Sequence, residues 1–471
     1  MDLEAILQRE FGFTAFRPGQ KNIIQQLLAG QDVLGILPTA TGKSLCYQFP
    51  GRLLTGAILI VSPLLSLMED QQQQLQLLGE RKVLALNSQL SFQEKQYALR
   101  HIRDYHYILT SPETLQQEEV LQALKQLKLA LFVVDEAHCI SQWGVDFRPE
   151  YLKLPRIQQA LGQPQTLALT ATASPPVQAE IQELLLQTPF TERGSVDRPN
   201  IGLMVQETTD KWETLVQLLP HLSRPGIIYC ATRKKVEQLN QALREAGYAS
   251  MFYHGGLASD ERLRIQQQFQ NGQAELLCAT NAFGMGINHQ DVRFVLHYEL
   301  SSGLENYVQE FGRAGRDGQP ALAILLYQKQ DERIHHFFQQ ETQQNRLLLE
   351  ALQTSAREEI AQLVPNLPEL QQKWLLGYLH GEYELPELIE RIRQKEVERS
   401  QQLQAMIHYI ETKECRRRVI QRYFGDPEIS QPPEVCCDNC GLELTAFYQE
   451  PAAIPESPTE WSAILKTLFF S

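Results

Sequence analysis

Three segments of the sequence carry residue types suited to phosphate chemistry, and the first lies near the N-terminus. Residues 37–44 read LPTATGKS, between an apolar run and a helical pattern. A turn of this kind presents backbone N–H groups to phosphates, with Lys43 reaching the β- and γ-phosphates and the Ser44 hydroxyl holding Mg²⁺. Leu37 stands where the strict pattern has glycine, so a plain strand-to-helix turn is the alternative interpretation.

The second segment, LFVVDEAH at residues 131–138, is an apolar run that ends in two adjacent carboxylates. Asp135 is placed to hold Mg²⁺, and Glu136 is placed to orient or deprotonate the attacking water in phosphoryl transfer. A solvated strand end with two acidic residues is the alternative. Together with Lys43 and Ser44, the pair predicts a site for nucleotide hydrolysis.

The third segment, QEFGRAGRDG at residues 309–318, contains two arginines three residues apart, Arg313 and Arg316, on one side of a turn. An arginine that points into a nucleotide cleft stabilises charge on the transferred phosphoryl group. Both lie far along the sequence from Lys43, so the contact forms only when two parts of the chain close on each other. A basic turn with glycines is the alternative.

Four of the eight cysteines cluster near the C-terminus: Cys415, Cys436, Cys437 and Cys440. They supply enough thiolates for a tetrahedral Zn²⁺ site, and in a reducing compartment such clustering favours metal over disulfides. Cys437 and Cys440 have the usual two-residue gap, whereas Cys436 directly precedes Cys437. If Cys436 is a bystander, Asp438 or water completes the shell, and unligated thiols are a further alternative.

The clearest basic patch of the chain follows the first of these cysteines and comprises Arg416, Arg417, Arg418 and Arg422. A solvated helix face is the alternative interpretation. Lys and Arg number 43 and Asp and Glu 56, so the net charge is −13. No global positive field therefore attracts nucleic acid, and any polyanion must bind through local basic residues.

Short apolar runs bounded by turn signals predict the strands that position these residues. They lie at 33–37, 57–61, 83–86, 131–134 and 167–169, and again at 226–230, 251–253, 276–279, 293–296 and 322–327. Helical patterns lie between them, which is typical of a mainly parallel sheet covered on both faces. We therefore predict an α/β fold with two lobes in tandem.

Four domains are predicted: lobe 1 at 1–205, lobe 2 at 206–337, a helical and zinc-binding subdomain at 338–440, and a flexible tail at 441–471. Long stretches rich in Gln, Glu, Leu and Arg predict the helices of the subdomain. The tail ends in an apolar stretch, 461–470, that either docks a protein partner or folds back on the lobes. The glutamine run 71–74 is interpreted as a solvated helix face.

Composition favours an ordinary folded protein, since hydrophobic residues at 43% and charged residues at 21% are close to the values of soluble globular chains. The most apolar stretch, 53–68, is shorter than a membrane span and contains Pro63. The N-terminal residues MDLEAILQRE lack the pattern of a secretory signal. We therefore expect a cytoplasmic protein with no membrane partner.

The ordered set of motifs resembles the RecQ family of DNA helicases, in helicase superfamily two, over residues 7–440. FGFTAFRPGQ at 11–20 resembles the adenine-reading motif, which implies that Phe13 and Arg17 sandwich the base and Gln20 hydrogen-bonds its edge. The resemblance assigns ATP binding also to Thr41, Gly42, Lys43 and Ser44. Further motifs follow in the family's order: SPLLSLMEDQ (62–71), SPETL (111–115), LALTATA (167–173), DRPNI (197–201), YHGGL (253–257) and ATNAFGMGIN (279–288).

The most family-specific piece is CISQWGVDFRPEY at residues 139–151. Its Trp143 and Phe147 suit stacking on bases, and Arg148 suits phosphate or cation–π contact, whereas ordinary packing of the aromatic rings is the alternative. In the family this loop couples DNA binding to ATP hydrolysis. The resemblance implies this role for the three residues and for His138 beside them.

The resemblance implies two RecA-like lobes and a zinc-binding subdomain that use ATP, Mg²⁺ and Zn²⁺. It implies 3′ to 5′ movement on single-stranded DNA and unwinding of tailed duplexes in repair or recombination, at the nucleoid. Ser301 and Ser302 replace a Pro-basic pair of the family, and too few residues follow Cys440 for a winged-helix domain, so unwinding is expected to be weak or partner-assisted. An ATP-gated single-stranded-DNA-binding or strand-annealing module and an RNA-directed DEAH enzyme are the alternative functions.

Overall fold

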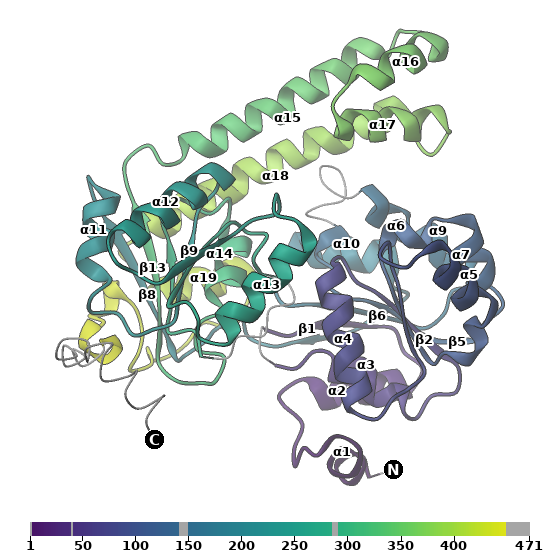
Figure 1. Cartoon of the computed structure of the whole chain (residues 1–471), viewed down its shortest axis with the longest axis horizontal. Coiled ribbons are helices and arrows are strands. Elements are labelled where there is room, and N and C mark those ends of the chain that lie inside the picture. Colours follow the sequence, from purple (N-terminus) through teal and green to yellow (C-terminus); the bar gives the residue numbers. More distant parts are fainter. Residues whose placement is uncertain (1, 39–40, 141–148, 285–290, 449–471) are drawn as a thin grey trace, which may run out of the picture.

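The computed structural model describes residues 2–38, 41–140, 149–284 and 291–448 (Figure 1). Two parallel sheets each form the centre of one lobe, and a helical arm runs from lobe 2 over lobe 1. Among the described residues, no helix is long and apolar enough to cross a lipid bilayer.

In lobe 1 the described strands pair in the order β3-β4-β2-β5-β6-β1-β7, all parallel. They are β1 (Val33–Ile36), β2 (Ala57–Val61), β3 (Val83–Leu86), β4 (Tyr107–Thr110), β5 (Leu129–Val134), β6 (Thr166–Thr170) and β7 (Phe190–Arg193). The central strands are buried along almost their whole length, because helices cover both faces of the sheet. Continuous Val, Ile and Leu runs are the sequence form that such strands take.

The helices of lobe 1 connect these strands and carry local signals that start and stop them. They are α1 (Leu3–Phe11), α2 (Gln20–Leu28), α3 (Leu45–Gly51), α4 (Leu65–Leu77), α5 (Phe92–Arg100), α6 (Pro112–Leu115), α7 (Glu118–Leu124), α9 (Leu154–Ala160) and α10 (Pro175–Leu185). Ser91 and Glu94 form a capping box at the start of α5, and Gly12 ends α1 in the left-handed conformation.

In lobe 2 the described strands pair in the order β10-β11-β9-β12-β13-β8, again all parallel. They are β8 (Ile201–Glu207), β9 (Gly226–Tyr229), β10 (Ser250–Tyr253), β11 (Leu276–Ala279), β12 (Phe294–His297) and β13 (Ala321–Tyr327). The helices are α11 (Lys211–Leu218), α12 (Arg233–Glu245), α13 (Ser259–Gln270) and α14 (Leu304–Phe311). The sheet of lobe 2 thus begins at Ile201, and the boundary expected after residue 205 falls inside β8.

The arm consists of two long helices and a helical tip. α15 (Arg333–Leu352) and α18 (Leu385–Glu411) run side by side, and the tip holds α16 (Arg357–Leu363) and α17 (Glu369–Leu379). Trp374 is fully buried in a hydrophobic cluster of the arm's own, together with Leu349 and Ile392. The C-terminal end of α18 packs instead into the core of lobe 2. The arm is therefore rooted in lobe 2 and has its own core further out.

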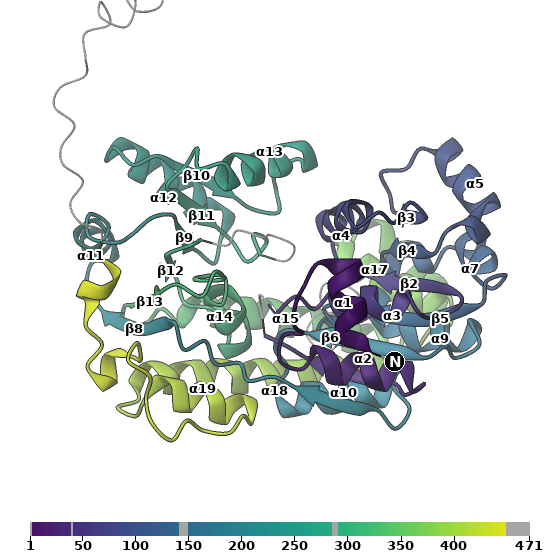
Figure 2. The same ribbon diagram turned by 90° about the horizontal axis from the view of Figure 1, so that it is seen from below.

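The cysteine-containing segment follows the arm and packs on lobe 2 (Figure 2). It contains α19 (Arg416–Phe424) and two 3₁₀ turns, Asp438–Cys440 and Leu444–Phe447. Residues 441–448, which the sequence assigned to a flexible tail, pack on lobe 2 through the buried Phe447 and a bridge between Leu222 and Tyr448. The apolar stretch 461–470 lies outside the described residues. The predicted fold class, two tandem RecA-like lobes followed by a helical zinc-binding subdomain, is confirmed.

Candidate active site

Parallel pairing brings the nucleotide motifs of lobe 1 to one edge of its sheet. β6 lies between β1 and β5, so the carboxyl ends of these three strands are adjacent. The phosphate-loop motif follows β1, Asp135 follows β5, and Thr170 ends β6. Ligands of open parallel sheets bind at such carboxyl ends, so the topology assembles a nucleotide site from three distant segments.

The turn that contains Gly42 is braced by the side chain of Gln20. The Gln20 Nε2 donates to the carbonyls of Thr41 (2.7 Å) and Gly42 (2.9 Å), while its Oε1 accepts from the backbone N–H of Arg17 (2.9 Å). Gly42 has a φ of +71°, and a Cβ there would lie 3.2 Å from Gln20 Nε2. Both ends of the Gln20 amide are thus engaged by the protein, which links the phosphate loop to the predicted adenine motif. Phe13 of that motif is 54% exposed.

Asp135 is a buried carboxyl held by a glutamine from α4. Gln71 Nε2 donates to Asp135 Oδ2 at 2.7 Å, and the backbone N–H of Glu136 donates to Asp135 Oδ1 at 3.0 Å. Burial, with the neighbouring Glu136 charge, raises the pKa of Asp135 to about 6. Gln71 is 4% exposed, so the interpretation of 71–74 as one solvated face is wrong for its first residue.

Glu136 occupies the centre of the site. Its Oε1 lies 3.6 Å from Lys43 Nζ, and its backbone adopts a φ of +50°, a strained conformation for a residue with a Cβ. Burial alone would raise the pKa of the Glu136 carboxyl. Lys43, His138 and Arg313 outweigh burial and hold this pKa below its ordinary value. Glu136 is therefore an ionised, fixed acceptor at neutral pH.

His138 connects Glu136 to the end of β6. Its Nδ1 lies 2.9 Å from Thr170 Oγ1 and 3.3 Å from Glu136 Oε2. Because the Thr170 hydroxyl donates to the carbonyl of Thr172 at 3.0 Å, the short contact requires a proton on Nδ1. Burial lowers the pKa of His138, so the ring is neutral at pH 7.

The two arginines of lobe 2 lie in a turn that follows α14. Arg313 is 6% exposed and donates to the carbonyl of Gly284. Burial, together with the charges of Arg313 and Arg198, lowers the pKa of Arg316 to about 9. A small cavity of about 10 Å³ is lined by Pro38 of lobe 1 and Gly312 of lobe 2, so this turn faces the phosphate loop across the lobe boundary.

The turn itself is held by the segment that joins the lobes, residues 194–200 between β7 and β8. Arg198 donates to the carbonyls of Gly312 (2.9 Å) and Gly315 (2.7 Å), and Asn200 Nδ2 donates to the carbonyl of Gly315 at 2.9 Å. Gly315 has a φ of +54°, and a Cβ there would lie 2.5 Å from Asn200 Nδ2. Both side chains belong to the DRPNI motif, and their partners are too distant in sequence for the motif alone to indicate this role.

The four C-terminal cysteines form a site that fits Zn²⁺. Their sulfur atoms all lie within 4.8 Å of one another, and the Cys415 and Cys436 sulfurs are 3.6 Å apart. Tetrahedral Zn–S bonds of about 2.3 Å place sulfurs about 3.8 Å apart, so Cys436 fits as a ligand. Asp438 instead accepts from Arg416 and from the backbone N–H of Val205, which leaves four thiolates as the donor set.

The basic patch expected at α19 does not form as such. Arg416 and Arg417 are 4% and 2% exposed. Arg417 donates to the carboxylate of Asp197 and to the backbone carbonyls of Arg198, Ile201 and Val435. Arg422 is exposed but pairs with Glu414 and Glu428. These arginines bind protein groups, because α19 packs against the segment that joins the lobes.

The structure describes the aromatic loop only at its two ends, residues 139–140 and 149–151. Trp143, Phe147 and Arg148 lie outside the described residues. His138, to which the same coupling role was assigned, lies beside Glu136 as given above.

Comparison with known proteins identifies the family. DEAD/DEAH box helicase matches residues 17–181, Helicase conserved C-terminal domain matches 210–318, and RecQ zinc-binding matches 383–441. The probable ATP-dependent DNA helicase RecS of Bacillus subtilis is 40% identical over 99% of this chain and 98% of its own length. The chain belongs to the RecQ family of ATP-dependent DNA helicases. It is accordingly an ATP-dependent DNA helicase with a RecQ zinc-binding domain.

Other RecQ relatives differ in how much of their length this chain spans. The ATP-dependent DNA helicase RecQ of Synechocystis is 36% identical over 93% of this chain and 98% of its own length. The RecQ of Haemophilus influenzae is 36% identical over 93% of this chain, which spans only 63% of that protein.

Solved structures support the two-lobed fold of the RecQ chain. Mycobacterium smegmatis helicase Lhr, bound to ssDNA and AMP-PNP, gives a TM-score of 0.57 at 21% identity, over 69% of this chain and 47% of its own. S. cerevisiae Dbp5, bound to RNA and ADP BeF3, gives a TM-score of 0.58 at 19% identity, over 70% of this chain and 88% of its own. At these identities the likeness concerns the fold alone.

Proposed function

We propose that this helicase hydrolyses ATP between its two lobes and thereby moves 3′ to 5′ along single-stranded DNA, unwinding tailed duplexes in repair or recombination. The observation that carries the proposal is the position of Glu136, which lies beside Lys43 of lobe 1 and within the field of Arg313 of lobe 2. A site built from both lobes changes when the lobes move, so hydrolysis and motion are coupled. Acting on chromosomal DNA, the protein would reside with the nucleoid in the cytoplasm.

Each residue of the site has a proposed role. Lys43 and the N–H groups of Thr41 and Gly42 bind phosphates, and Glu136 orients the attacking water. Ser44 and Asp135 would hold Mg²⁺, which when bound neutralises phosphate charge. Arg313 and Arg316 of lobe 2 stabilise charge on the transferred phosphoryl group. Phe13 and Arg17 of lobe 1 hold the adenine ring between them.

Gln20, whose amide the phosphate loop and Arg17 already engage, positions that loop and reads the adenine edge only by exchanging one of these contacts. His138, which contacts Glu136, couples ATP hydrolysis to DNA binding by the aromatic loop of Trp143, Phe147 and Arg148. The division into lobe 1, lobe 2, a helical zinc-binding part and a tail is proposed as the functional one, with β8 counted in lobe 2.

ATP hydrolysis with and without single-stranded DNA tests these roles. Glu136→Gln should bind ATP but lose hydrolysis by about 10²- to 10⁴-fold, because the amide is no base. Glu118→Gln, at an exposed acid of α7, is the matched control and should behave as wild type. Trp143→Ala should keep basal hydrolysis and lose stimulation by DNA. Stimulation by RNA alone would replace the DNA assignment with an RNA-directed enzyme, and full activity of Glu136→Gln would refute the site.

A further inference from the structure

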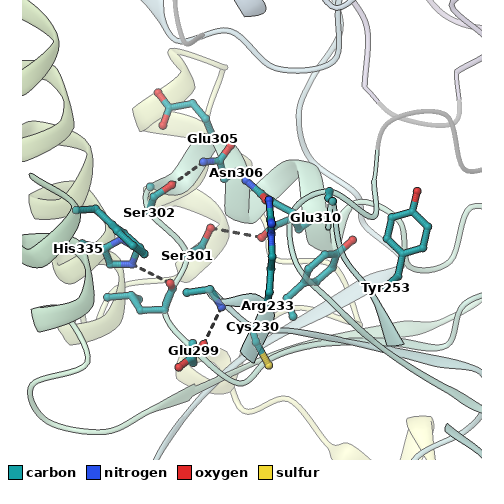
Figure 3. Close-up of a pocket in the computed structure, with 18 of the residues that line it drawn as sticks. Cys230, Arg233, Tyr253, Glu299, Ser301, Ser302, Glu305, Asn306, Glu310 and His335 are labelled. Atoms are coloured by element: carbon teal, nitrogen blue, oxygen red, sulfur yellow. Dashed lines mark hydrogen bonds between the residues drawn. The ribbon is translucent and has the colours of Figure 1, made fainter. Parts of the chain in front are cut away.

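A large cavity, lined by none of the residues assigned above to the nucleotide site, has walls from three parts of the chain. Its volume is about 830 Å³. Lobe 1 contributes Leu64, Leu65, Glu69 and Gln89; lobe 2 contributes residues that include Arg233, Tyr253, Asn281, Ser302 and Asn306; the arm contributes residues that include His335, Phe338, Thr342, Arg399 and Gln402. In Figure 3, Ser301 and Ser302 lie between His335 of α15 and Arg233 of α12. The arm is therefore a wall of this cavity and not a distant appendage.

Two groups of the arm wall, which also includes Glu341 and Glu398, suit single-stranded nucleic acid. Phe338 lines the cavity and is 39% exposed, so its ring is available for stacking on a base. Arg399 lines the same wall, and its Nη1 donates to Thr342 Oγ1 at 2.9 Å, which fixes the guanidinium next to the cavity. An aromatic ring and an arginine on one surface are the usual components of a sequence-independent strand site.

The arm is attached at both of its ends. At its root in lobe 2, His335 Nε2 donates to the carbonyl of Leu300 at 2.8 Å. At its tip, Glu382 Oε2 lies 2.6 Å from Lys153 Nζ of lobe 1, and Arg156 donates to the carbonyl of Glu382 at 3.1 Å. Leu152 of lobe 1 packs against the hydrophobic cluster of the arm. Figure 1 shows the arm extending over both lobes.

Attachments to both lobes turn an open groove into an enclosed passage; on lobe 1 they are the Glu382 tip and a longer ion pair, Lys395 Nζ to Glu180 Oε2 at 3.8 Å. A single strand of DNA that lies between the lobes and beneath the arm can leave in two ways. Either one end of the DNA slides out of the passage, or one attachment of the arm opens. The half-buried Glu382–Lys153 pair is the weaker attachment, because partly solvated ion pairs contribute little stability. We propose that the arm is the third wall of the passage for single-stranded DNA and that its Glu382 tip is the latch that closes the passage. The proposal rests on strand translocation between the lobes, as proposed above, and adds the arm wall and the latch to it.

The role of the arm as a wall is tested by substituting two neighbouring phenylalanines. Phe338 lines the cavity, whereas Phe337 is 65% exposed and does not line it. Phe338→Ala should weaken binding of fluorescent oligo-dT at least about five-fold, measured by anisotropy, while Phe337→Ala should stay within two-fold of wild type. Equal affinity of the two variants would overturn the arm wall. Thermal unfolding of both variants confirms that each is folded.

The latch is tested by dissociation from circular and linear oligo-dT of equal length, after addition of unlabelled competitor. An enclosed strand without ends should leave wild type at least about ten-fold more slowly than a linear one. Glu382→Lys, which repels Lys153, should abolish this difference, and the exchange Glu382→Lys with Lys153→Glu should restore it. Equal release of both DNAs from wild type would overturn the passage.

Hydrolysis of ATP stimulated by linear oligo-dT is measured on the same wild-type protein. Stimulation without a difference between circular and linear DNA removes the enclosed passage but keeps the proposed function. Lack of any stimulation removes the proposed function, and with it the passage.

Discussion

Arg417 should be among the most stabilising single side chains of the molecule. Its guanidinium is 1% exposed, pairs with Asp197 and donates to the carbonyls of Arg198, Ile201 and Val435. Arg417→Ala leaves a largely buried carboxylate and several carbonyls without their donor. Removing one partner of a buried charged pair costs about 3–5 kcal/mol, because the other charge stays buried and unpaired.

The loss should be visible in thermal unfolding. For a domain of about 150–250 residues, which is the size of one lobe, a loss of 1 kcal/mol lowers Tm by about 2–4 °C. Arg417→Ala should therefore lower Tm by roughly 6–20 °C. Arg422→Ala is the matched control on the same helix and should lower Tm only slightly, because Arg422 is 53% exposed and solvent screens its ion pairs. Arg417→Lys should recover only part of the loss, because an ammonium cannot reproduce the planar fork.

The same substitution should reduce hydrolysis at temperatures where the protein is still folded. Arg417 holds the segment that carries Arg198, and Arg198 holds the turn of Arg313 and Arg316. The kcat of DNA-stimulated hydrolysis should therefore fall more than the KM for ATP changes. The reasoning is refuted if Arg417→Ala lowers Tm no more than Arg422→Ala does.

Three other predictions concern the nucleotide site, lobe 2 and the cysteines. Lys43→Ala should reduce phosphate release to background because the positive charge that binds the ATP phosphates is lost, whereas Lys21→Ala, at a lysine of α2 whose side chain is 44% exposed, should leave it unchanged. Burial raises the pKa of Glu305, so ionisation destabilises the fold as the pH rises above the ordinary value of 4.5. Glu305→Gln should therefore raise Tm at pH 7.5 relative to wild type, and a gain of equal size at pH 4 would contradict this. Cys436→Ser and Cys437→Ser should both lose zinc by atomic emission and unfold at lower temperature, and full zinc content in Cys436→Ser would remove it from the ligand set.

Much of the fold follows from local pattern. Fully buried parallel strands such as β2 and β11 are continuous apolar runs and were predicted at their observed positions. β7 reads FTER and lies at the edge of its sheet, where polar side chains face solvent, so no apolar run marks it. The second half of β8 is likewise only partly buried, which placed the expected lobe boundary inside it.

The residues of the candidate site likewise fall into two groups, those that a local motif indicates and those that only the packing reveals. Lys43 and the carboxylates at 135 and 136 belong to contiguous motifs whose backbone geometry is local, so the sequence indicates them directly. Gln71 and Arg198 act on groups that are distant in sequence, and only the packing of α4 and of the segment joining the lobes reveals their partners. For Arg417 the sequence suggested a basic patch, because charge alone does not distinguish a solvated arginine from one that binds buried carbonyls.

The most direct test of the account is ATP-driven strand displacement on two duplexes, one with a 3′ single-stranded tail and one with a 5′ tail. Lys43→Ala is the control, and ATP hydrolysis is followed in the same reactions. We expect displacement of the 3′-tailed duplex alone, and none by the control. Hydrolysis stimulated by both DNAs without displacement of either would contradict it and would favour an ATP-gated single-stranded-DNA-binding or annealing module.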